Sequence, residues 1–423
     1  MGITSGTGVR LLLLICFVGH VRLQQSAKDY NYTGNKLMEV HLDRDSHVRV
    51  IKNLKDSFLE HWPKVFATGG RVHVVAPSEE YVKVQRNFTE GGMKYKVLNP
   101  SHGINTNELE MRGLENNLEM TWEFYNPLSE IDRYVKGIAA NHEFVELLQI
   151  GQTAEERQIL GLRINPGNSS HKVWIDGGFH AREWISPATV TYIVDQLTRN
   201  YTNNKDIADG FDWWIVPVAN PDGYEYTWTH DRLWRKNRRH SNNTQCVGVD
   251  LNRNWDFYWM EVGASSDPCS PVYAGPFAES EPEVRAVRDL ILELNSDNSL
   301  AIMLTIHSFY QAWMAPWGFK YEIPEDLDEM LAVLKAAVSA VKNTHGMEYK
   351  HGQVTEFLRP ASGCQDDWGK GVAKIKHSYT VELRDRGRNG FTLPRDQILP
   401  TAQETWEGVK AAVRKVVESK KRL

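Results

Sequence analysis

Two histidines and two glutamates stand where the fold can bring them together: His180, Glu183, His307 and Glu382. Each follows or ends an apolar, strand-like run, and in open α/β sheets ligands bind beyond the carboxyl ends of the strands. Two imidazoles and one carboxylate with an open fourth position make up a catalytic zinc site. His180 and Glu183 can reach one ion from a single turn, and His307 is the remote third ligand. The sequence therefore predicts one zinc ion at this edge.

Each of these residues alone also has a plainer interpretation. A His-x-x-Glu pair by itself rarely binds metal, and a histidine that ends a core strand is usually a hydrogen-bonded structural residue. Glu382 can also be half of a structural ion pair with Arg384 or a neighbour. The prediction of metal chemistry therefore rests on the combination of residues and on where they lie.

The elements that must position these residues alternate between strand and helix. Four apolar runs have the character of strands: 172–179, 212–219, 300–308 and 378–383. Four amphipathic stretches have the length and period of helices: 187–199, 279–294, 324–345 and 401–417. This alternation predicts an α/β fold with a mixed, mostly parallel central sheet flanked by helices on both faces.

The chain before residue 108 has a different pattern. Strand-like segments at 37–41 and 71–75 alternate with helical patterns at 50–61 and 78–87, which predicts a small α+β unit. This unit has no cluster of histidines, cysteines or carboxylates that would suggest chemistry. A polar, turn-rich stretch leads into residues 108–120, and such a stretch is typical of exposed, protease-sensitive chain.

The N-terminus carries a targeting pattern. Arg10 precedes a run of nine apolar or small residues, 11–19, which is too short to span a membrane but fits a secretory signal better than a short buried helix. Five Asn-x-Ser/Thr sequons agree with secretion: Asn31, Asn87, Asn168, Asn200 and Asn242. Cys246 and Cys269 enclose 22 residues and can form a disulfide in an oxidising compartment, which leaves Cys364 over. We therefore expect an extracellular protein.

Composition excludes several other classes. The 423 residues include 49 Lys and Arg against 54 Asp and Glu, a net charge of -5 that is too mild to suggest a nucleic-acid or membrane-surface partner. No later apolar stretch reaches the length of a membrane span. We expect a soluble globular monomer that binds neither nucleic acid nor membrane.

In order and spacing, six segments resemble the zinc carboxypeptidases of the pancreatic A/B type: His180-Ala-Arg-Glu-Trp-Ile, Asn220-Pro-Asp-Gly-Tyr, Trp234-Arg-Lys-Asn-Arg, Cys246-Val-Gly-Val-Asp-Leu-Asn-Arg-Asn-Trp, Ile306-His-Ser and Val381-Glu-Leu-Arg-Asp. The resemblance covers nearly the whole chain. It implies a signal peptide at 1–23, an inhibitory pro-domain at 24–107, an activation linker at 108–120 and a catalytic domain at 121–423. Within the linker, Arg112 would be cut by a trypsin-like protease.

The resemblance also assigns roles to individual residues. Glu382 would act as the general base and Arg235 would stabilise the oxyanion. Asn252 and Arg253 would bind the terminal carboxylate of a peptide or protein substrate, which makes the enzyme an exopeptidase. Arg182 would make a secondary substrate contact. Taken singly, Asn252 and Arg253 can also cap a turn.

The position of Asp366 matches the floor of the family's side-chain pocket. An acid there favours a C-terminal Lys or Arg, because a buried carboxylate needs a cationic partner. Arg359 falls where the family has a mobile tyrosine, and Phe309 stands where it often has another tyrosine. Both are expected at the substrate site.

Three alternatives stay open at this point. The first is the same chemistry with apolar C-terminal specificity. The second is a zinc-retaining binding protein whose catalysis is weak because of Arg359. The third is a secreted polyanion-binding glycoprotein that uses the five basic residues within 232–239.

Overall fold

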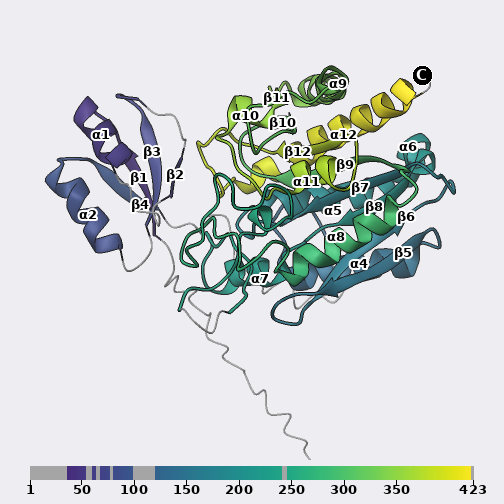
Figure 1. The fold of residues 1–423 in the computed structure, drawn as a ribbon, viewed down its shortest axis with the longest axis horizontal. Helices are drawn as coiled ribbons and strands as arrows, with labels where there is room; N and C mark the ends of the chain where they lie inside the picture. The colour runs from purple at the N-terminus through teal and green to yellow at the C-terminus, as the bar shows by residue number, and fades with distance from the viewer. Residues whose placement is uncertain are drawn as a thin grey trace, which may run out of the picture. The chain divides into compact units, whose positions relative to one another are not determined.

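The computed structural model describes six stretches of the chain: residues 36–53, 60–62, 67–76, 80–98, 120–240 and 245–420 (Figure 1). The expected signal peptide, cleavage site and two of the sequons lie outside the described residues: 1–23, Arg112, Asn31 and Asn242. Among the described helices, none combines the length and the apolar character that crossing a bilayer requires.

The larger sheet carries the predicted chemistry. Its strands are β5 (Val145–Gln152), β6 (Gln158–Ile164), β7 (Lys172–Gly177), β8 (Asp212–Val216), β9 (Leu300–His307), β10 (Ala312–Ala315), β11 (Lys350–Gln353) and β12 (Ser378–Glu382). Their order is β11-β10-β12-β9-β7-β8-β6-β5, and the pairs β10–β11, β12–β9, β9–β7 and β7–β8 are parallel. The predicted mixed, mostly parallel sheet is confirmed, and β7, β8, β9 and β12 are its four predicted strands.

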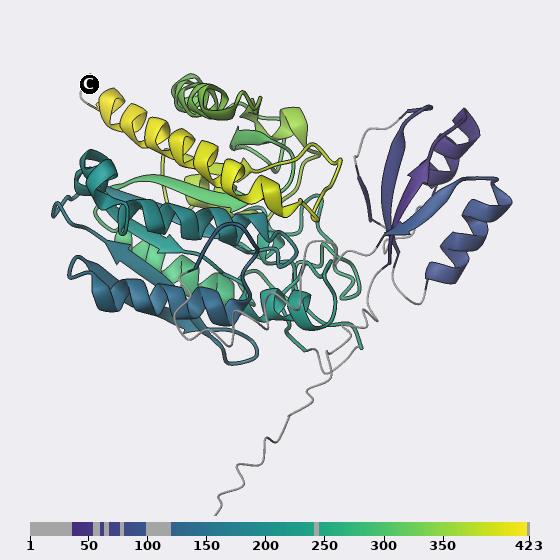
Figure 2. The ribbon, with the colours of Figure 1, turned by 180° about the vertical axis from the view of Figure 1, so that it is seen from behind.

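Helices cover both faces of this sheet (Figures 1 and 2). One face packs against α4 (Leu128–Asn141), α5 (Ile185–Leu197), α9 (Leu327–His345) and α12 (Ile398–Lys420). The other face packs against α8 (Pro282–Leu294) and α11 (Gln365–Gly371). Strand β7 shows the reason, because Val173 and Ile175 point into the first core while Trp174 points into the second.

Shorter helices connect these layers. They are η1 (Tyr201–Asn204), α6 (Lys205–Gly210), α7 (Pro221–Thr229), η2 (Leu251–Arg253), α10 (Val354–Phe357) and η3 (Arg395–Gln397). Asn220 caps α7 by accepting a hydrogen bond from the Gly223 N–H at 2.9 Å. The Asn220 amide also donates to the carbonyls of Phe179 and Lys236, so one buried side chain joins three segments.

The N-terminal unit forms an antiparallel sheet of order β2-β3-β1-β4 with two helices. Its elements are β1 (Lys36–His41), α1 (Asp45–Asn53), β2 (Glu60–Trp62), β3 (Arg71–Ala76), α2 (Tyr81–Glu90) and β4 (Tyr95–Leu98). The expected α+β character is confirmed, but the helix predicted over 50–61 was misplaced. Asp45 lies in the first turn of α1, where its charge favours a helix N-terminus, and Glu60–Trp62 pairs with β3 instead.

Candidate metal centre

Three parallel strands bring the predicted residues to one edge. His307 ends β9 and Glu382 ends β12, and the two are direct partners in the ladder. His180 follows β7 through a turn at Gly178, where φ is 69° and a Cβ would lie 3.2 Å from the Cα of Val218. Only glycine fits this turn without strain, and the turn places His180 beside His307.

The three predicted metal ligands converge. His180 Nδ1 lies 2.8 Å from Glu183 Oε1, His307 Nδ1 lies 2.9 Å from Glu183 Oε2, and the two Nδ1 atoms are 3.1 Å apart. All three residues are buried, and their ligand atoms lie within 4.8 Å of one another. Two imidazole nitrogens and a carboxylate this close together fit the donor set of a zinc ion.

The environment shifts the pKa values of the residues in this cluster, each for its own reason. Burial favours a raised pKa at Glu183, but the nearby His180 and His307 outweigh burial and lower it. Burial, together with the charge of Arg235, lowers the pKa of His180. An ionised carboxylate and a neutral imidazole are the protonation states that bind a metal.

Glu382 has the free oxygen that a general base needs. Its Oε2 atom is buried and has no hydrogen-bond partner among the described residues. Burial, and next the charge of Glu183, raise the pKa of Glu382 to about 7. The alternative of an ion pair with Arg384 is wrong, because Arg384 pairs with Glu404 through two hydrogen bonds.

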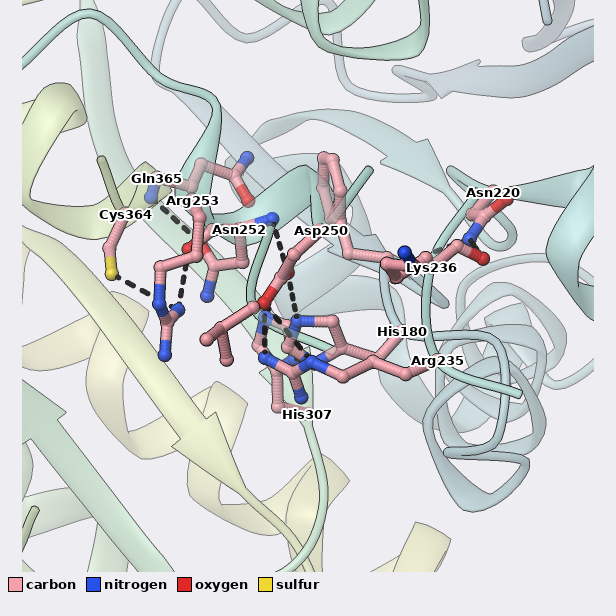
Figure 3. A network of polar contacts seen from close by, with 12 residues as sticks. His180, Asn220, Arg235, Lys236, Asp250, Asn252, Arg253, His307, Cys364 and Gln365 are labelled. Carbon is pink, nitrogen blue, oxygen red and sulfur yellow. Dashed lines mark hydrogen bonds and ion pairs between the residues drawn. The ribbon is translucent and has the colours of Figure 1, made fainter. Parts of the chain in front are cut away.

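Asp250 joins two parts of the site, and sequence reasoning missed it. It accepts from Arg235 Nε at 3.1 Å and Nη2 at 2.9 Å, and its other oxygen lies 3.2 Å from His180 Nε2 (Figure 3). A carboxylate in this place fixes the ring and tautomer of a metal-binding histidine. The signal was present, since Asp250 stands two residues before Asn252 in the same resembling segment.

Asn252 and Arg253, the pair predicted to bind the substrate carboxylate, lie next to Asp250 and the residues that it contacts. Asn252 Oδ1 accepts the backbone N–H of Gln365 at 2.9 Å, while Arg253 donates to the carbonyls of Asn252 and Gly263. Arg253 Nη1 also lies 3.6 Å from the sulfur of Cys364 (Figure 3). The guanidinium is only partly buried, so its remaining donors can reach a ligand.

The two acidic residues at the start of α11 have different surroundings. Asp367 accepts backbone N–H groups from Gly318 and Phe319, which gives it a structural role. Asp366 is buried, and its pKa is raised by burial against a hydrogen bond from Thr380. Burial therefore disfavours the ionised form of Asp366, as it does that of Asp367.

The remaining predicted contacts lie at different depths. Arg182 is buried, with its guanidinium 4.0 Å from the ring centroid of Phe391. Phe309 is half-buried and packs on the same ring at 4.9 Å. Arg359 is exposed, and no hydrogen bond or ion pair links it to another described residue.

The basic segment 232–239 does not form an open cationic patch. Arg232, Lys236 and Arg238 are all buried. The guanidinium of Arg232 stacks 3.8 Å from the ring centroid of Trp184. The polyanion-binding alternative therefore loses its main feature.

Cys246 and Cys269 form the predicted disulfide, and Cys364 is a buried free cysteine. Among the described sequons, Asn87 and Asn168 are exposed. Asn200 is half-buried, and its amide donates to Gln196 Oε1 at 2.7 Å.

Comparison with known proteins agrees with this geometry. A family model described as "Zinc carboxypeptidase" matches residues 131–408. The chain belongs to the zinc carboxypeptidase family. It is therefore a zinc metallocarboxypeptidase, and the His-Glu-His group is a site that could hold its metal.

Individual relatives of this zinc carboxypeptidase include both types. The chain is 44% identical to "Carboxypeptidase B" of Astacus astacus over 69% of this chain and 96% of that one. It is 36% identical to "Carboxypeptidase A1" of Bos taurus over 90% and 93%. The crystal structure of thrombin activatable fibrinolysis inhibitor aligns with a TM-score of 0.77 at 31% identity, covering 91% of this chain and 99% of that one.

Proposed function

We propose that this zinc carboxypeptidase is a secreted exopeptidase, made as a zymogen, that removes C-terminal Lys or Arg. The observation that carries the specificity is the buried Asp366 carboxylate beside Asp367. Burial, followed by the charge of Asp366, raises the pKa of Asp367 well above its usual range, and no Lys or Arg of the described residues forms an ion pair with either acid. A substrate guanidinium or ammonium supplies a compensating cation.

The chemistry divides among the residues of the metal centre. His180, Glu183 and His307 would hold the zinc ion, which would supply Lewis-acid chemistry for polarising the scissile carbonyl and acidifying water. Glu382 takes the proton of the attacking water at its unpaired Oε2 and passes it to the leaving amine. With a pKa of about 7, Glu382 can both accept and release that proton near neutral pH.

Arg235 and Arg253 each interact with a different negative charge of the substrate. Arg235, held in place by Asp250, stabilises the negative charge that develops on the carbonyl oxygen. Arg253, with Asn252 beside it, binds the terminal carboxylate and so restricts cleavage to the last peptide bond. The exposed Arg359 adds a second cation for that carboxylate in place of the family's tyrosine.

Targeting and activation complete the proposal. Residues 1–23 direct secretion, 24–107 form the inhibitory pro-domain, and cleavage after Arg112 within 108–120 releases the catalytic domain 121–423. The exposed sequons Asn87 and Asn168 are accessible to glycosylation.

One assay tests this proposal. The full chain is treated with trypsin and tested on blocked dipeptides that end in Arg, Lys, Leu or Phe, with and without a chelator. We expect chelator-sensitive release of Arg and Lys, with kcat/KM at least about 100-fold above that for Leu. Preference for Phe or Leu would refute the role of Asp366, and one bound zinc without turnover would favour the binding-protein alternative.

Two variants sharpen the result. Asp366→Leu should transfer the preference to apolar C-termini while zinc stays bound, because only the pocket charge is removed. Glu382→Gln should abolish turnover with little change in zinc content. Full activity of Glu382→Gln would refute the mechanism itself.

A further inference from the structure

The two histidines of the metal centre differ in what holds their outer nitrogen. His180 Nε2 faces the carboxylate of Asp250 directly at 3.2 Å. His307 Nε2 instead faces a hydroxyl, with Thr305 Oγ1 at 3.3 Å. Metal-binding histidines depend on such outer partners to fix their ring orientation and tautomer.

Behind Thr305 lies a second carboxylate. Thr305 and Asp176 are direct partners in the β7–β9 ladder, and neither side chain is exposed to solvent. Asp176 Oδ1 is buried and has no hydrogen-bond partner among the described residues. Because Asp176 lies directly opposite Thr305 in the ladder, this oxygen is an acceptor available to the Thr305 hydroxyl.

Two side chains already donate hydrogen bonds to Asp176, so Asp176 acts as an acceptor. This sets the direction of the hydrogen bonds that lead from His307 through Thr305 to Asp176. The Trp174 indole N–H donates to Asp176 Oδ2 at 2.5 Å, and the Gln365 amide donates to the same oxygen at 2.6 Å. A histidine whose Nδ1 binds metal carries its proton on Nε2 and must donate there. The Thr305 hydroxyl can accept that proton and donate its own to Asp176.

We propose that Thr305 is a positioning residue for the zinc site: its hydroxyl accepts the Nε2 hydrogen of His307 and donates to Asp176, which keeps Nδ1 of His307 aimed at the metal. Gln365 anchors the far end of this relay. Because Gln365 precedes Asp366 in α11, the same relay ties the floor of the specificity pocket to the metal ligand. The inference rests on the zinc site of the proposed function.

The test compares two substitutions of one side chain. Thr305→Val keeps the β-branched shape and removes the hydroxyl, whereas Thr305→Ser keeps the hydroxyl. Zinc affinity of the full chain is measured by competition with a chromophoric chelator, without substrate. We expect Thr305→Val to bind zinc roughly 10- to 100-fold more weakly and Thr305→Ser to stay close to the unchanged protein.

A matched control lies on the neighbouring strand. Thr380 is the ladder partner of Thr305 on β12, is also buried, and hydrogen-bonds to Asp366 rather than to a metal ligand. Thr380→Val should therefore leave zinc affinity unchanged. Denaturant unfolding of the metal-free forms of all three variants separates loss of metal positioning from general loss of stability.

Specific outcomes would overturn the relay. Unchanged zinc affinity in Thr305→Val would do so, as would an equal loss of affinity in Thr305→Ser or Thr380→Val. Absence of peptidase activity in the unchanged protein would contradict the proposed function instead. The two failures are distinguishable because the zinc measurement needs no turnover.

Discussion

The metal centre and the start of α8 both bury glutamates, yet the two regions treat their charge in opposite ways. At the metal centre, two histidines lower the pKa of Glu183 despite its burial. In the α8 cluster, which we define as Glu281, Glu283 and Asn237, burial raises the pKa of Glu281, and burial together with the charge of Glu281 raises that of Glu283 to about 7. Neighbours rather than depth decide whether a buried carboxylate is ionised.

The difference matches what each group holds. Glu183 must be ionised to bind a cation, whereas Glu281 and Glu283 accept hydrogen bonds from the neutral amide of Asn237. The Asn237 amide donates to Glu281 Oε2 at 2.7 Å and to Glu283 Oε2 at 3.1 Å, and Asn237 Oδ1 accepts the backbone N–H of Val249 at 2.8 Å. The α8 cluster thereby joins the segments that carry Arg235 and Asp250.

The largest expected effect comes from removing the charge of Glu183. Glu183→Gln leaves one carbonyl oxygen where two carboxylate oxygens face the histidines. Loss of an outer partner typically costs 10- to 100-fold in metal affinity, so loss of a ligand should cost more than about 100-fold in zinc affinity and in activity. Zinc content by atomic absorption and kcat/KM measure this.

Glu283→Gln is the matched control for that experiment. A carboxamide resembles the protonated acid, which is the state that the raised pKa of Glu283 favours. Zinc content and kcat/KM should stay near those of the unchanged protein. Loss of zinc from this variant would mean that the two regions are not independent.

Asp250 gives the next largest effect, because it is a buried carboxylate with cationic neighbours. Burial favours a raised pKa, but Arg235 and Arg253 outweigh it and hold the pKa of Asp250 well below its usual range. Asp250→Asn removes the carboxylate that accepts two hydrogen bonds from the largely buried Arg235. We expect a loss of about 3–5 kcal/mol in unfolding free energy, measured in urea, together with a lower kcat.

A control for Asp250 lies at the other end of the sheet. Asp212 is buried at the start of β8 and accepts from Arg163 Nε at 3.0 Å and Nη2 at 3.1 Å. Asp212→Asn should reduce stability and leave kcat unchanged, because Asp212 lies at the start of β8, whereas the metal ligands lie at the carboxyl ends of the parallel strands. An unchanged kcat in Asp250→Asn would mean that Arg235 does not need its ion pair with Asp250 for its role in catalysis.

The sequence predicted the elements and residues whose signals are local. Strands β9 and β12 end in His307 and Glu382, and His180 follows β7, so their shared edge followed from the parallel arrangement. The strands β10 and β11 were missed because each has only four residues, too few to show a period. Such short strands are fixed by tertiary pairing rather than by propensity.

The outer residues of the site could not be predicted for a related reason. Asn237 contacts Glu281, and Thr305 faces Asp176 across the β7–β9 ladder, and both of these partners are distant in the chain. Asn237, for example, meets Glu281 across 44 positions. Their roles depend on which oxygen faces which nitrogen, and only the folded chain determines that.

The pH dependence of stability comes third in size. The pKa of Glu283 rises from 4.5 to about 7 on folding, so the folded protein binds this proton more tightly than the unfolded chain. The stability linked to the proton is fully present below about pH 4.5 and is lost as the pH rises through about 7. The loss corresponds to at most about 3 kcal/mol.

The variant Glu283→Gln isolates this contribution from the other titrating groups. Urea unfolding of both proteins is measured from pH 5 to pH 8. The unchanged protein should lose stability relative to the variant over this range. A constant difference would show that Glu283 is ionised throughout, as Glu183 is, and would end the contrast between the regions.

The smallest expected effect concerns Arg239, the cation that lies nearest to the α8 cluster by the ion pairs described. Its Nε atom lies 3.8 Å from Glu281 Oε1, and its side chain is 40% exposed. Solvent screens so exposed a pair, so Arg239→Gln should cost less than about 1 kcal/mol of unfolding free energy. Added salt should shrink even this difference, because the guanidinium reaches water. A cost of several kcal/mol would instead mean that Arg239 keeps Glu281 ionised, and the α8 cluster would then resemble the metal centre in depending on a paired charge.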